Sequence, residues 1–187
     1  EFGSNAGQFV DVVNYPDGGT AGRYMVGWES GELLRGGALA DRIEGRGGDD
    51  VLVGGAGDNR LDGGAGIDTA AYDAARSTVT YGATVDGLRV RHGQGADTLA
   101  GIERLRFTDV SVAPDTDGAA GTAYALYHAA FGRAPDLAGL GFWLAMSDRG
   151  ATAGELAQSF AASTEFRPTL ERDATAFIET LYANALQ

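Results

Sequence analysis

Six consecutive nine-residue windows between Gly18 and Ala71 share one register. Every window begins with glycine, and four of the six carry a second glycine at position two. Position eight holds a single apolar residue in each window: Met25, Leu34, Ile43, Leu52, Leu61 and Ala70. Glycine permits tight turns, and an isolated apolar residue can point inward from a very short strand. Each window therefore predicts a turn followed by a strand, and the series predicts a coil with a stacked apolar core.

Position six of the windows supplies oxygen atoms that can bind a cation. It holds Glu32, Asp41, Asp50, Asn59 and Asp68 in five successive windows. Each window makes half a coil, so a turn lies over the turn eighteen residues later. Asp41 and Asn59 are thus expected to share one site, and Asp50 and Asp68 another. Because Ca²⁺ takes about six to eight oxygen ligands in flexible geometry, the spacing predicts calcium between successive turns.

The pattern Gly-Gly-x-Gly-x-Asp-x-apolar-x resembles the repeats-in-toxin (RTX, or hemolysin-type) family. The resemblance implies a calcium-loaded parallel β-roll and export by the type I secretion machinery to the cell exterior or the cell surface. In that family the earlier turn offers the carbonyl oxygens of positions two and four, and the later turn those of positions one and three. Carried over, these ligands are Gly37, Leu39, Gly54 and Ala56 in the first site, and Arg46, Gly48, Gly63 and Ala65 in the second.

Departures from the pattern indicate where further or weaker sites lie. Glu32 replaces aspartate in its window, so a third site between Glu32 and Asp50 is one alternative. Arg23 stands at position six of the first window and offers no oxygen, so that window is interpreted as a cap. Asp73 is a candidate to close a fourth site with the turn of residues 54–59. A flexible linker rich in glycine and aspartate is the alternative to the whole roll, but four windows in phase argue against it.

The composition agrees with a cation-binding function. The formal net charge is −12, and seven aspartates lie between Asp41 and Asp73. Such a chain is a poor partner for nucleic acid, whose phosphates attract lysine and arginine. No stretch approaches the ~20 apolar residues of a membrane helix, so no membrane insertion is expected. The chain has no cysteine, which leaves bound metal to stabilise a protein outside the cell.

Residues 77–113 alternate between apolar and polar side chains and predict strands at 78–81, 87–91 and 105–112, the last with a slip near Asp109. Leu88 and Val90 are expected to face inward. Residues 92–97 predict a turn cluster, in which His92 is interpreted as a solvated residue rather than a ligand. The segment resembles those that follow calcium rolls in secreted bacterial proteins, and it is expected to form a β cap over the open end of the roll.

From residue 119 onward the apolar spacing becomes helical. It predicts a first helix ending at Gly132, a second from Asp136 to Gly150, a third opened by a capping box at Thr152, and a fourth over 168–186. The aromatic residues of these helices, Trp143 included, and Phe166 are interpreted as core. The string FGRAPDLAGLGFW at 131–143 resembles a helical bacterial family known only as a domain of unknown function.

The expected fold class is multidomain, β plus α: a calcium-loaded parallel β-roll with a β cap, followed by a small all-α domain. The expected domains are a tag residue and lead-in at 1–17, the roll at 18–76, the cap at 77–113, a linker at 114–118 and the helical domain at 119–187.

Three functions fit these features. The first is a calcium-binding module of a secreted or cell-surface bacterial protein that folds on calcium binding after type I secretion. The second is an adhesion or surface-layer unit whose helical tail binds a protein or a glycan. The third is the non-catalytic C-terminal part of a secreted enzyme. The chain has no His-Glu-x-x-His, no Gly-x-Ser-x-Gly and no cysteine nucleophile, so no catalysis is expected within these residues.

Overall fold

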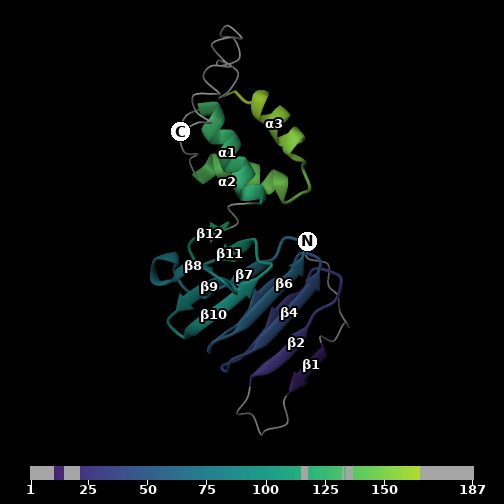
Figure 1. Ribbon diagram of the computed structural model, residues 1–187, viewed down its shortest axis with the longest axis vertical. Coiled ribbons are helices and arrows are strands. Elements are labelled where there is room, and N and C mark those ends of the chain that lie inside the picture. Colours follow the sequence, from purple (N-terminus) through teal and green to yellow (C-terminus); the bar gives the residue numbers. More distant parts are fainter. Residues whose placement is uncertain (1–10, 15–21, 115–117, 132, 134–136, 165–187) are drawn as a thin grey trace. The chain divides into compact units, whose positions relative to one another are not determined.

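The computed structural model describes residues 11–14, 22–114, 118–131, 133 and 137–164. The chain divides into two compact units, Glu1–Pro114 and Asp115–Gln187. The first unit carries the β-strands and the second carries helices α1 to α3 (Figure 1). None of the helices in the described part of the chain is long and apolar enough to cross a membrane.

Short strands of the first unit alternate between two sheets. The seven-stranded sheet has the order β1-β2-β4-β6-β10-β9-β8, and the five-stranded sheet has the order β12-β11-β7-β5-β3. The strand bounds are β1 Asp11–Asn14, β2 Arg23–Val26, β3 Leu33–Arg35, β4 Arg42–Gly47, β5 Val51–Val53, β6 Arg60–Ala65, β7 Thr69–Ala71, β8 Thr80–Thr84, β9 Gly87–His92, β10 Gly95–Ala100, β11 Arg104–Arg106 and β12 Ser111–Val112.

Strands from alternate windows pair in parallel, which confirms the predicted parallel β-roll. In one sheet Met25 pairs with Ile43 and Ile43 with Leu61, while in the other Leu34 pairs with Leu52. The residues at position eight are all buried and form one core, as their spacing predicts: Met25, Leu34, Ile43, Leu52, Leu61 and Ala70. One apolar residue per strand is enough for a core because eighteen residues bring the chain back to the same sheet.

The segment after the windows both continues and caps the roll. A hairpin of β8 and β9 comes first, and β10 then pairs in parallel with β6, matching Leu99 to Leu61. Strand β11 pairs in parallel with β7, matching Leu105 to Ala70. Residues 95–106 therefore add another coil, which the prediction of a turn cluster through Asp97 missed.

The predicted strand boundaries change at two further places. A 3₁₀ helix at Arg76–Thr78 replaces the expected start of a strand, so β8 begins at Thr80. The single strand expected at 105–112 is two antiparallel strands, β11 and β12, in which Leu105 pairs with Val112. The predicted slip near Asp109 is thus the bend of a hairpin. Val90 is buried and Leu88 packs against the core, as predicted.

The second unit is a small helical cluster with an aromatic core. Helices α1, α2 and α3 span Ala119–Phe131, Leu137–Ser147 and Ala153–Ala161. The buried core residues are Ala123, Tyr127, Trp143, Leu156 and Phe160. The predicted capping box is confirmed, because the Thr152 hydroxyl accepts from the Glu155 amide and the Glu155 carboxylate accepts from the Thr152 amide. Gly150 has a φ of 87°, the left-handed backbone that suits glycine after a helix.

Two aromatic residues of the helices are exposed, against the prediction that the aromatics form the core. Tyr124 is 45 % exposed and stacks on His128, and Phe142 is 59 % exposed. Phe142 directly precedes the buried Trp143, and consecutive helix residues point to different sides. Tyr124 lies three residues before the buried Tyr127 and so shares its side of the helix, yet it remains exposed. The predictions for Gly132, Asp136, Phe166 and the fourth helix fall outside the described residues.

Candidate metal centre

Position six of each turn carries the side chain that joins one coil to the next. In every pair of stacked turns, the backbone N–H of the earlier residue donates to a side-chain oxygen of the later one. Two such ladders run along the roll, one on each row of turns. The first ladder contains Arg23, Asp41, Asn59 and Asp97, and the second contains Glu32, Asp50, Asp68 and Glu103.

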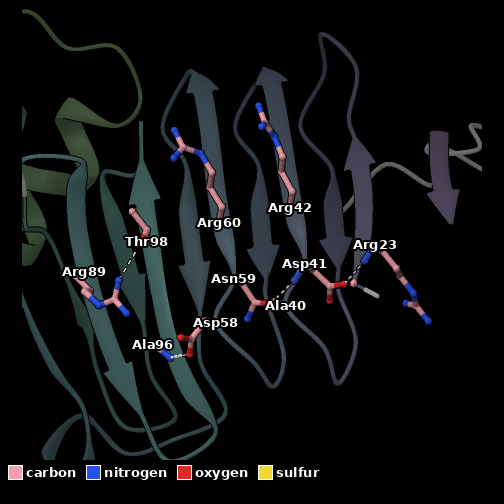
Figure 2. A pocket seen from close by; sticks show the side chains of 11 residues that line it. Arg23, Ala40, Asp41, Arg42, Asp58, Asn59, Arg60, Arg89, Ala96 and Thr98 are labelled. Atoms are coloured by element: carbon pink, nitrogen blue, oxygen red, sulfur yellow. Dashed lines mark hydrogen bonds between the residues drawn. The ribbon is translucent and has the colours of Figure 1, made fainter. Parts of the chain in front are cut away.

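The first ladder borders a hollow of about 430 Å³ (Figure 2). The Arg23 amide donates to Asp41 Oδ1, and the Asp41 amide donates to Asn59 Oδ1 at 2.9 Å. Asp41 Oδ2 accepts from the amide of Gly37 within its own turn. Asp41 and Asn59 are therefore stacked as the sequence predicts, and both oxygens of Asp41 have backbone donors.

The second ladder leaves carboxylate oxygens without donors. The Asp50 amide donates to Asp68 Oδ1 at 2.8 Å, and Asp50 Oδ1 accepts from the Glu32 amide at 2.8 Å. The other oxygens, Asp50 Oδ2 and Asp68 Oδ2, are buried and have no hydrogen-bond partner. A buried, unpaired carboxylate oxygen is costly unless a cation or a donor reaches it. The second ladder thus has two carboxylate oxygens that need positive charge, and Asp97 Oδ2 at the end of the first ladder is a third.

Glycine at position one of a turn makes room for these oxygens. A Cβ added to Gly45 would lie 2.1 Å from Asp50 Oδ2 and 2.5 Å from the carbonyl oxygen of Gly63. The same arrangement recurs at Gly36, whose added Cβ would lie 2.4 Å from Asp41 Oδ2 and 2.3 Å from the carbonyl oxygen of Gly54. In each case, the carboxylate oxygen of the turn itself and a carbonyl oxygen of the next coil face the same free space beside the glycine. At Gly45 the two acceptors converge with no donor, which is a setting for a hard cation, whereas at Gly36 the carboxylate oxygen also accepts from the Gly37 amide.

The carbonyl oxygens of positions two and four face the later turn. A Cβ added to Gly64 would lie 2.1 Å from the Arg46 oxygen, and one added to Gly66 would lie 2.3 Å from the Gly48 oxygen. Likewise, a Cβ added to Gly55 would lie 2.1 Å from the Gly37 carbonyl oxygen, and one added to Gly57 would lie 3.0 Å from the Leu39 carbonyl oxygen. These four carbonyl oxygens thus lie between the turns, where that of Gly37 accepts from the Ala56 amide at 2.9 Å. The roles of all the carbonyl oxygens as ligands, those of Ala56 and Ala65 included, stay predictions.

Glu32 differs from the aspartates of its ladder. Its carboxylate accepts from the Trp28 amide at 2.9 Å and from the Ser30 hydroxyl, both within its own turn. The longer side chain lets both oxygens reach local donors. A Cβ added to Gly27 would lie 2.8 Å from Glu32 Oε2 and 2.5 Å from the Gly45 carbonyl oxygen, so the alternative site between Glu32 and Asp50 stays a prediction.

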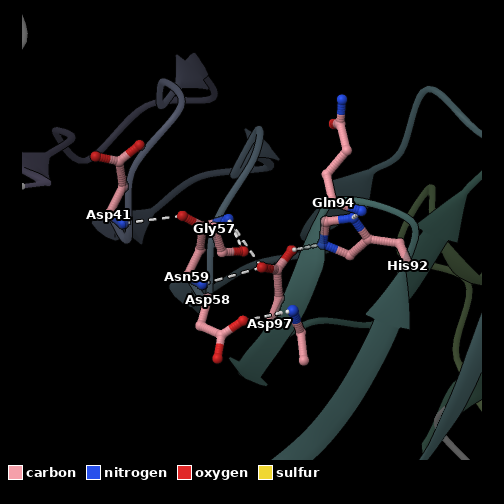
Figure 3. A network of polar contacts seen from close by, with 8 residues as sticks. Asp41, Gly57, Asp58, Asn59, His92, Gln94 and Asp97 are labelled. Atoms are coloured by element: carbon pink, nitrogen blue, oxygen red, sulfur yellow. Dashed lines mark hydrogen bonds and ion pairs between the residues drawn. The ribbon is translucent and has the colours of Figure 1, made fainter.

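The structure corrects the prediction for Asp73. This exposed residue lies in a bend after β7, while the turn that stacks on residues 54–59 is 92–97. Asp97 takes the place expected for Asp73, since its Oδ1 accepts from the backbone amide and the side-chain amide of Asn59 at 3.0 Å and 2.8 Å (Figure 3). The prediction for Asp73 was wrong because residues 72–91 interrupt the nine-residue register before the roll resumes.

His92 is also corrected, from a solvated turn residue to a buried one. Its side chain is 6 % exposed, and its Nε2 lies 3.4 Å from Asp97 Oδ2 (Figure 3). The imidazole packs on Tyr72, with ring centroids 5.4 Å apart. His92 occupies position one of the resumed window, where the other turns have glycine, so its side chain enters the space that the glycines leave free.

Sequence reasoning missed two residues of the ladders, Asp97 and Glu103. A signal for Asp97 exists, because HGQGADTLA at 92–100 has glycine, glycine, aspartate and leucine at positions two, four, six and eight. Glu103 has no such signal, since its turn runs from Gly101 to Glu103 and lacks most of the pattern. Only the pairing of Arg104 with Thr69 shows where Glu103 lies.

Burial raises the pKa values of two carboxylates in the second ladder. Burial, with nearby Asp68 and Glu32, raises the pKa of Asp50 to about 7, and burial, with nearby Glu103, raises that of Asp68 to about 6. In the described part of the chain, no three side chains of His, Cys, Asp or Glu gather closely enough to hold a metal by themselves. Any bound cation therefore needs the turn carbonyl oxygens as well, and the turns supply them.

These pKa values predict that the metal-free roll is more stable at pH 5 than at pH 8. The folded values lie above the unfolded value of about 3.9, so the folded state binds more protons between about pH 4 and pH 7. Stability is fully present at the low end of that range and is lost as pH rises through the folded pKa values. Far-UV circular dichroism of the chain in chelator, followed from pH 8 to pH 5, measures this, and the β signal should grow as the pH falls. A combined Asp50→Asn and Asp68→Asn variant should lose this pH dependence, and more β signal at pH 8 than at pH 5 in the wild type would contradict the assignment.

Comparisons with known proteins agree with this geometry. Residues 35–70 match the model of the RTX calcium-binding nonapeptide repeat, in four copies, and residues 122–170 match a domain of unknown function, DUF4214. One similar solved structure is the extracellular lipase LipA from Serratia marcescens, at 28 % identity and a TM-score of 0.42. That match covers 45 % of this chain and only 14 % of the lipase chain. None of the curated proteins compared matches this chain.

Neither matched family is a catalytic domain. The repeats recognised at 35–70 lie in the part of the roll that contains the glycine turns and the buried carboxylates of Asp41, Asp50 and Asp68. The chain therefore carries RTX calcium-binding nonapeptide repeats followed by a DUF4214 domain, and its repeats bind Ca²⁺ as a module of a secreted bacterial protein.

Proposed function

We propose that the roll is a folding module that leaves the cell unfolded through the type I secretion machinery and folds outside, when calcium reaches its turns. In this proposal one ion lies between the turns of Asp41 and Asn59, and another between the turns of Asp50 and Asp68. The predicted carbonyl oxygens complete each site. The domain limits expected from the sequence, with the roll at 18–76 and the helical domain at 119–187, belong to the same proposal.

The observation that carries this proposal is the state of Asp50 Oδ2. This oxygen is buried, has no hydrogen-bond donor and converges with the Gly63 carbonyl oxygen on the space that Gly45 leaves open. Its neighbour in the ladder, Asp68, brings a second negative charge. Without a cation, the ladder pays for burying these charges and for their mutual repulsion. With one, the same oxygens become ligands, so that binding free energy becomes folding free energy.

The low calcium concentration inside cells explains why such a module would fold only after export. Extracellular calcium modules bind at roughly 10⁻⁴–10⁻³ M, far above cytosolic free calcium. The core also depends on the turns, because the strands of the roll are only three to six residues long from β2 to β7. Each strand contributes a single inward apolar residue and cannot hold the coil if the turns repel one another.

A calcium titration tests the function. The whole chain is brought from chelator to about 10 mM calcium, well above the roughly 10⁻⁴–10⁻³ M range of extracellular modules, while far-UV circular dichroism and hydrodynamic radius are followed. We expect a cooperative gain of β signal together with compaction, and no such change with Mg²⁺, which demands stricter octahedral geometry. An equal response to both ions, or a chain that stays compact in chelator at neutral pH, would overturn the proposal.

The helical unit supports a second function, as an adhesion or surface-layer unit that binds a protein or a glycan. Tyr124 and Phe142 are large aromatic side chains with 45 % and 59 % exposure. Exposed aromatics are enriched where proteins bind partners. Binding of glycans or cell surfaces by the chain that is lost in a Tyr124→Ala, Phe142→Ala variant would favour this function. The third alternative, a non-catalytic part of a secreted enzyme, concerns the parent protein and rests on the resemblance of the repeats alone.

A further inference from the structure

A second buried oxygen, Asp68 Oδ2, lies outside both sites proposed above. Asp68 uses Oδ1 to accept the Asp50 amide, and this oxygen faces the earlier turn. Its Oδ2 has no hydrogen-bond partner, and the residue is 0 % exposed. A Cβ added to Gly63 would lie 2.5 Å from this oxygen and 2.1 Å from the carbonyl oxygen of Gly101. Asp68 Oδ2 therefore faces the later coil, beyond the end of the recognised repeats at residue 70.

The turn that covers Asp68 is a shortened one. Strand β11 pairs with β7 in the register of the roll, with Arg104 beside Thr69, so that Glu103 stands one coil after Asp68. The turn from Gly63 to Asp68 has six residues, whereas the turn from Gly101 to Glu103 has three. The shortened turn keeps a position-one glycine and a position-six acid, and it loses the residues between them.

Both the backbone and the side chain of Glu103 are hydrogen-bonded to the backbone of Asp68. Its Oε2 accepts from the Asp68 amide at 2.9 Å, and its own amide donates to the Asp68 carbonyl oxygen at 3.1 Å. The longer glutamate side chain makes the ladder contact that an aspartate makes in a turn of full length. This places a second carboxylate beside the unpartnered Asp68 Oδ2.

We propose that Asp68 Oδ2, the Glu103 carboxylate and the Gly101 carbonyl oxygen form a further calcium site at the C-terminal end of the roll. The donors are all hard oxygens, which favour Ca²⁺ over transition metals. The short turn offers fewer carbonyl oxygens than a full one, so water completes the coordination and the site binds calcium more weakly than the site at Asp50. This inference rests on the calcium-dependent folding proposed above and extends it to residues outside the repeats.

If this site is filled, calcium stabilises the C-terminal end of the roll as well as its repeats. Gly101 and Glu103 lead directly into β11, and β11 carries β12 as its hairpin partner. Asp68 faces both the Asp50 turn and the Glu103 turn, so filling one site positions a ligand of the other. Residues 101–112 should therefore become ordered after the repeats, at a higher calcium concentration.

The test compares the calcium binding of the whole chain with that of a Glu103→Gln variant. Glutamine keeps an oxygen to accept the Asp68 amide and removes the negative charge. By calorimetry we expect Glu103→Gln to lose the weakest calcium, or to bind it about tenfold or more weakly, because ligand charge sets calcium affinity. Asp86→Asn is the matched control, since Asp86 is exposed in the β8–β9 turn and the substitution removes the same charge.

The outcomes separate this inference from the proposed function. If the wild type binds no calcium, the proposed function fails. If the wild type folds with calcium and Glu103→Gln binds the same number of ions with the same affinities, only the further site is overturned. Hydrogen exchange on the wild type gives a second measurement that does not depend on a variant folding. The amide protection of residues 101–112 should rise at a higher calcium concentration than the protection of residues 42–65 does. If the protection of 101–112 does not change with calcium, the site is overturned.

Discussion

Replacing Gly45 with alanine should raise the calcium concentration needed to fold the roll by about tenfold or more. The added Cβ would lie 2.1 Å from Asp50 Oδ2 and 2.5 Å from the Gly63 carbonyl oxygen, both far inside normal contact. Gly45 does not need a left-handed backbone, so the effect is steric and falls on the two oxygens of the site. Overpacking costs about 1–3 kcal/mol, and about 1.4 kcal/mol corresponds to a tenfold change in binding. The calcium midpoint of the far-UV signal measures it.

Gly82→Ala is the control for this substitution. Gly82 lies in β8, and a Cβ added there would meet nothing within 4 Å. Its calcium midpoint should equal that of the wild type, because the same methyl group enters open space. If Gly45→Ala and Gly82→Ala give the same midpoint, the space beside Asp50 is not part of a calcium site. A loss of folding in Gly45→Ala at every calcium concentration would mean that the turn itself cannot form.

The sequence was sufficient to predict the roll because the same pattern of glycine, acidic and apolar residues recurs every nine residues. Leu34, Ile43 and Leu52 recur every nine residues, and a period of nine allows only a coil in which each apolar residue stacks on the one eighteen residues away. The pairing of Asp50 with Asp68 follows from the same arithmetic. Local chemistry was also enough at Thr152, where a threonine and a glutamate three residues later cap a helix.

The end of the roll could not be predicted in this way, since strand pairing across an interruption is not a local property. The twenty residues from 72 to 91, a length that is not a multiple of nine, separate Ala71 from the next window. Asp97 therefore looked like part of a turn cluster although its window keeps the pattern. Glu103 sits in a turn with no pattern to recognise, and its place depends on β11 pairing with β7.

Position one of the resumed window shows how the same turn can end a ladder. Where Gly45 leaves space beside Asp50, His92 fills the equivalent space beside Asp97 with an imidazole. On the same row, the side-chain amide of Asn59 donates to Asp97 Oδ1 and to the Gly57 carbonyl oxygen. Asp97 Oδ1 thus has nitrogen donors, whereas Asp97 Oδ2 is buried without a hydrogen-bond partner, 3.4 Å from His92 Nε2. At the last pair of turns, a histidine faces the carboxylate of the first ladder, whereas the second ladder places Glu103 over Asp68.

Replacing Trp143 with alanine should unfold the helical unit and leave the calcium response of the roll unchanged. Trp143 is 8 % exposed and packs on Phe160, with ring centroids 4.6 Å apart, at the centre of the aromatic core. Removing a buried tryptophan side chain costs about 3–5 kcal/mol, which is a large share of the stability of a small unit. We expect the helical signal at 222 nm to be lost in chelator and in calcium alike.

Phe142→Ala supplies a control from the neighbouring position on the same helix. Phe142 is 59 % exposed, and surface substitutions usually change stability by no more than about 0.5 kcal/mol, so this variant should melt with the wild type. The calcium midpoint of the roll should be the same in all three proteins, because the buried aromatic cluster contains residues of the helical unit alone. A shifted midpoint in Trp143→Ala would show that the units fold together. A retained helical signal would show that the exposed and buried aromatics have been assigned to the wrong faces.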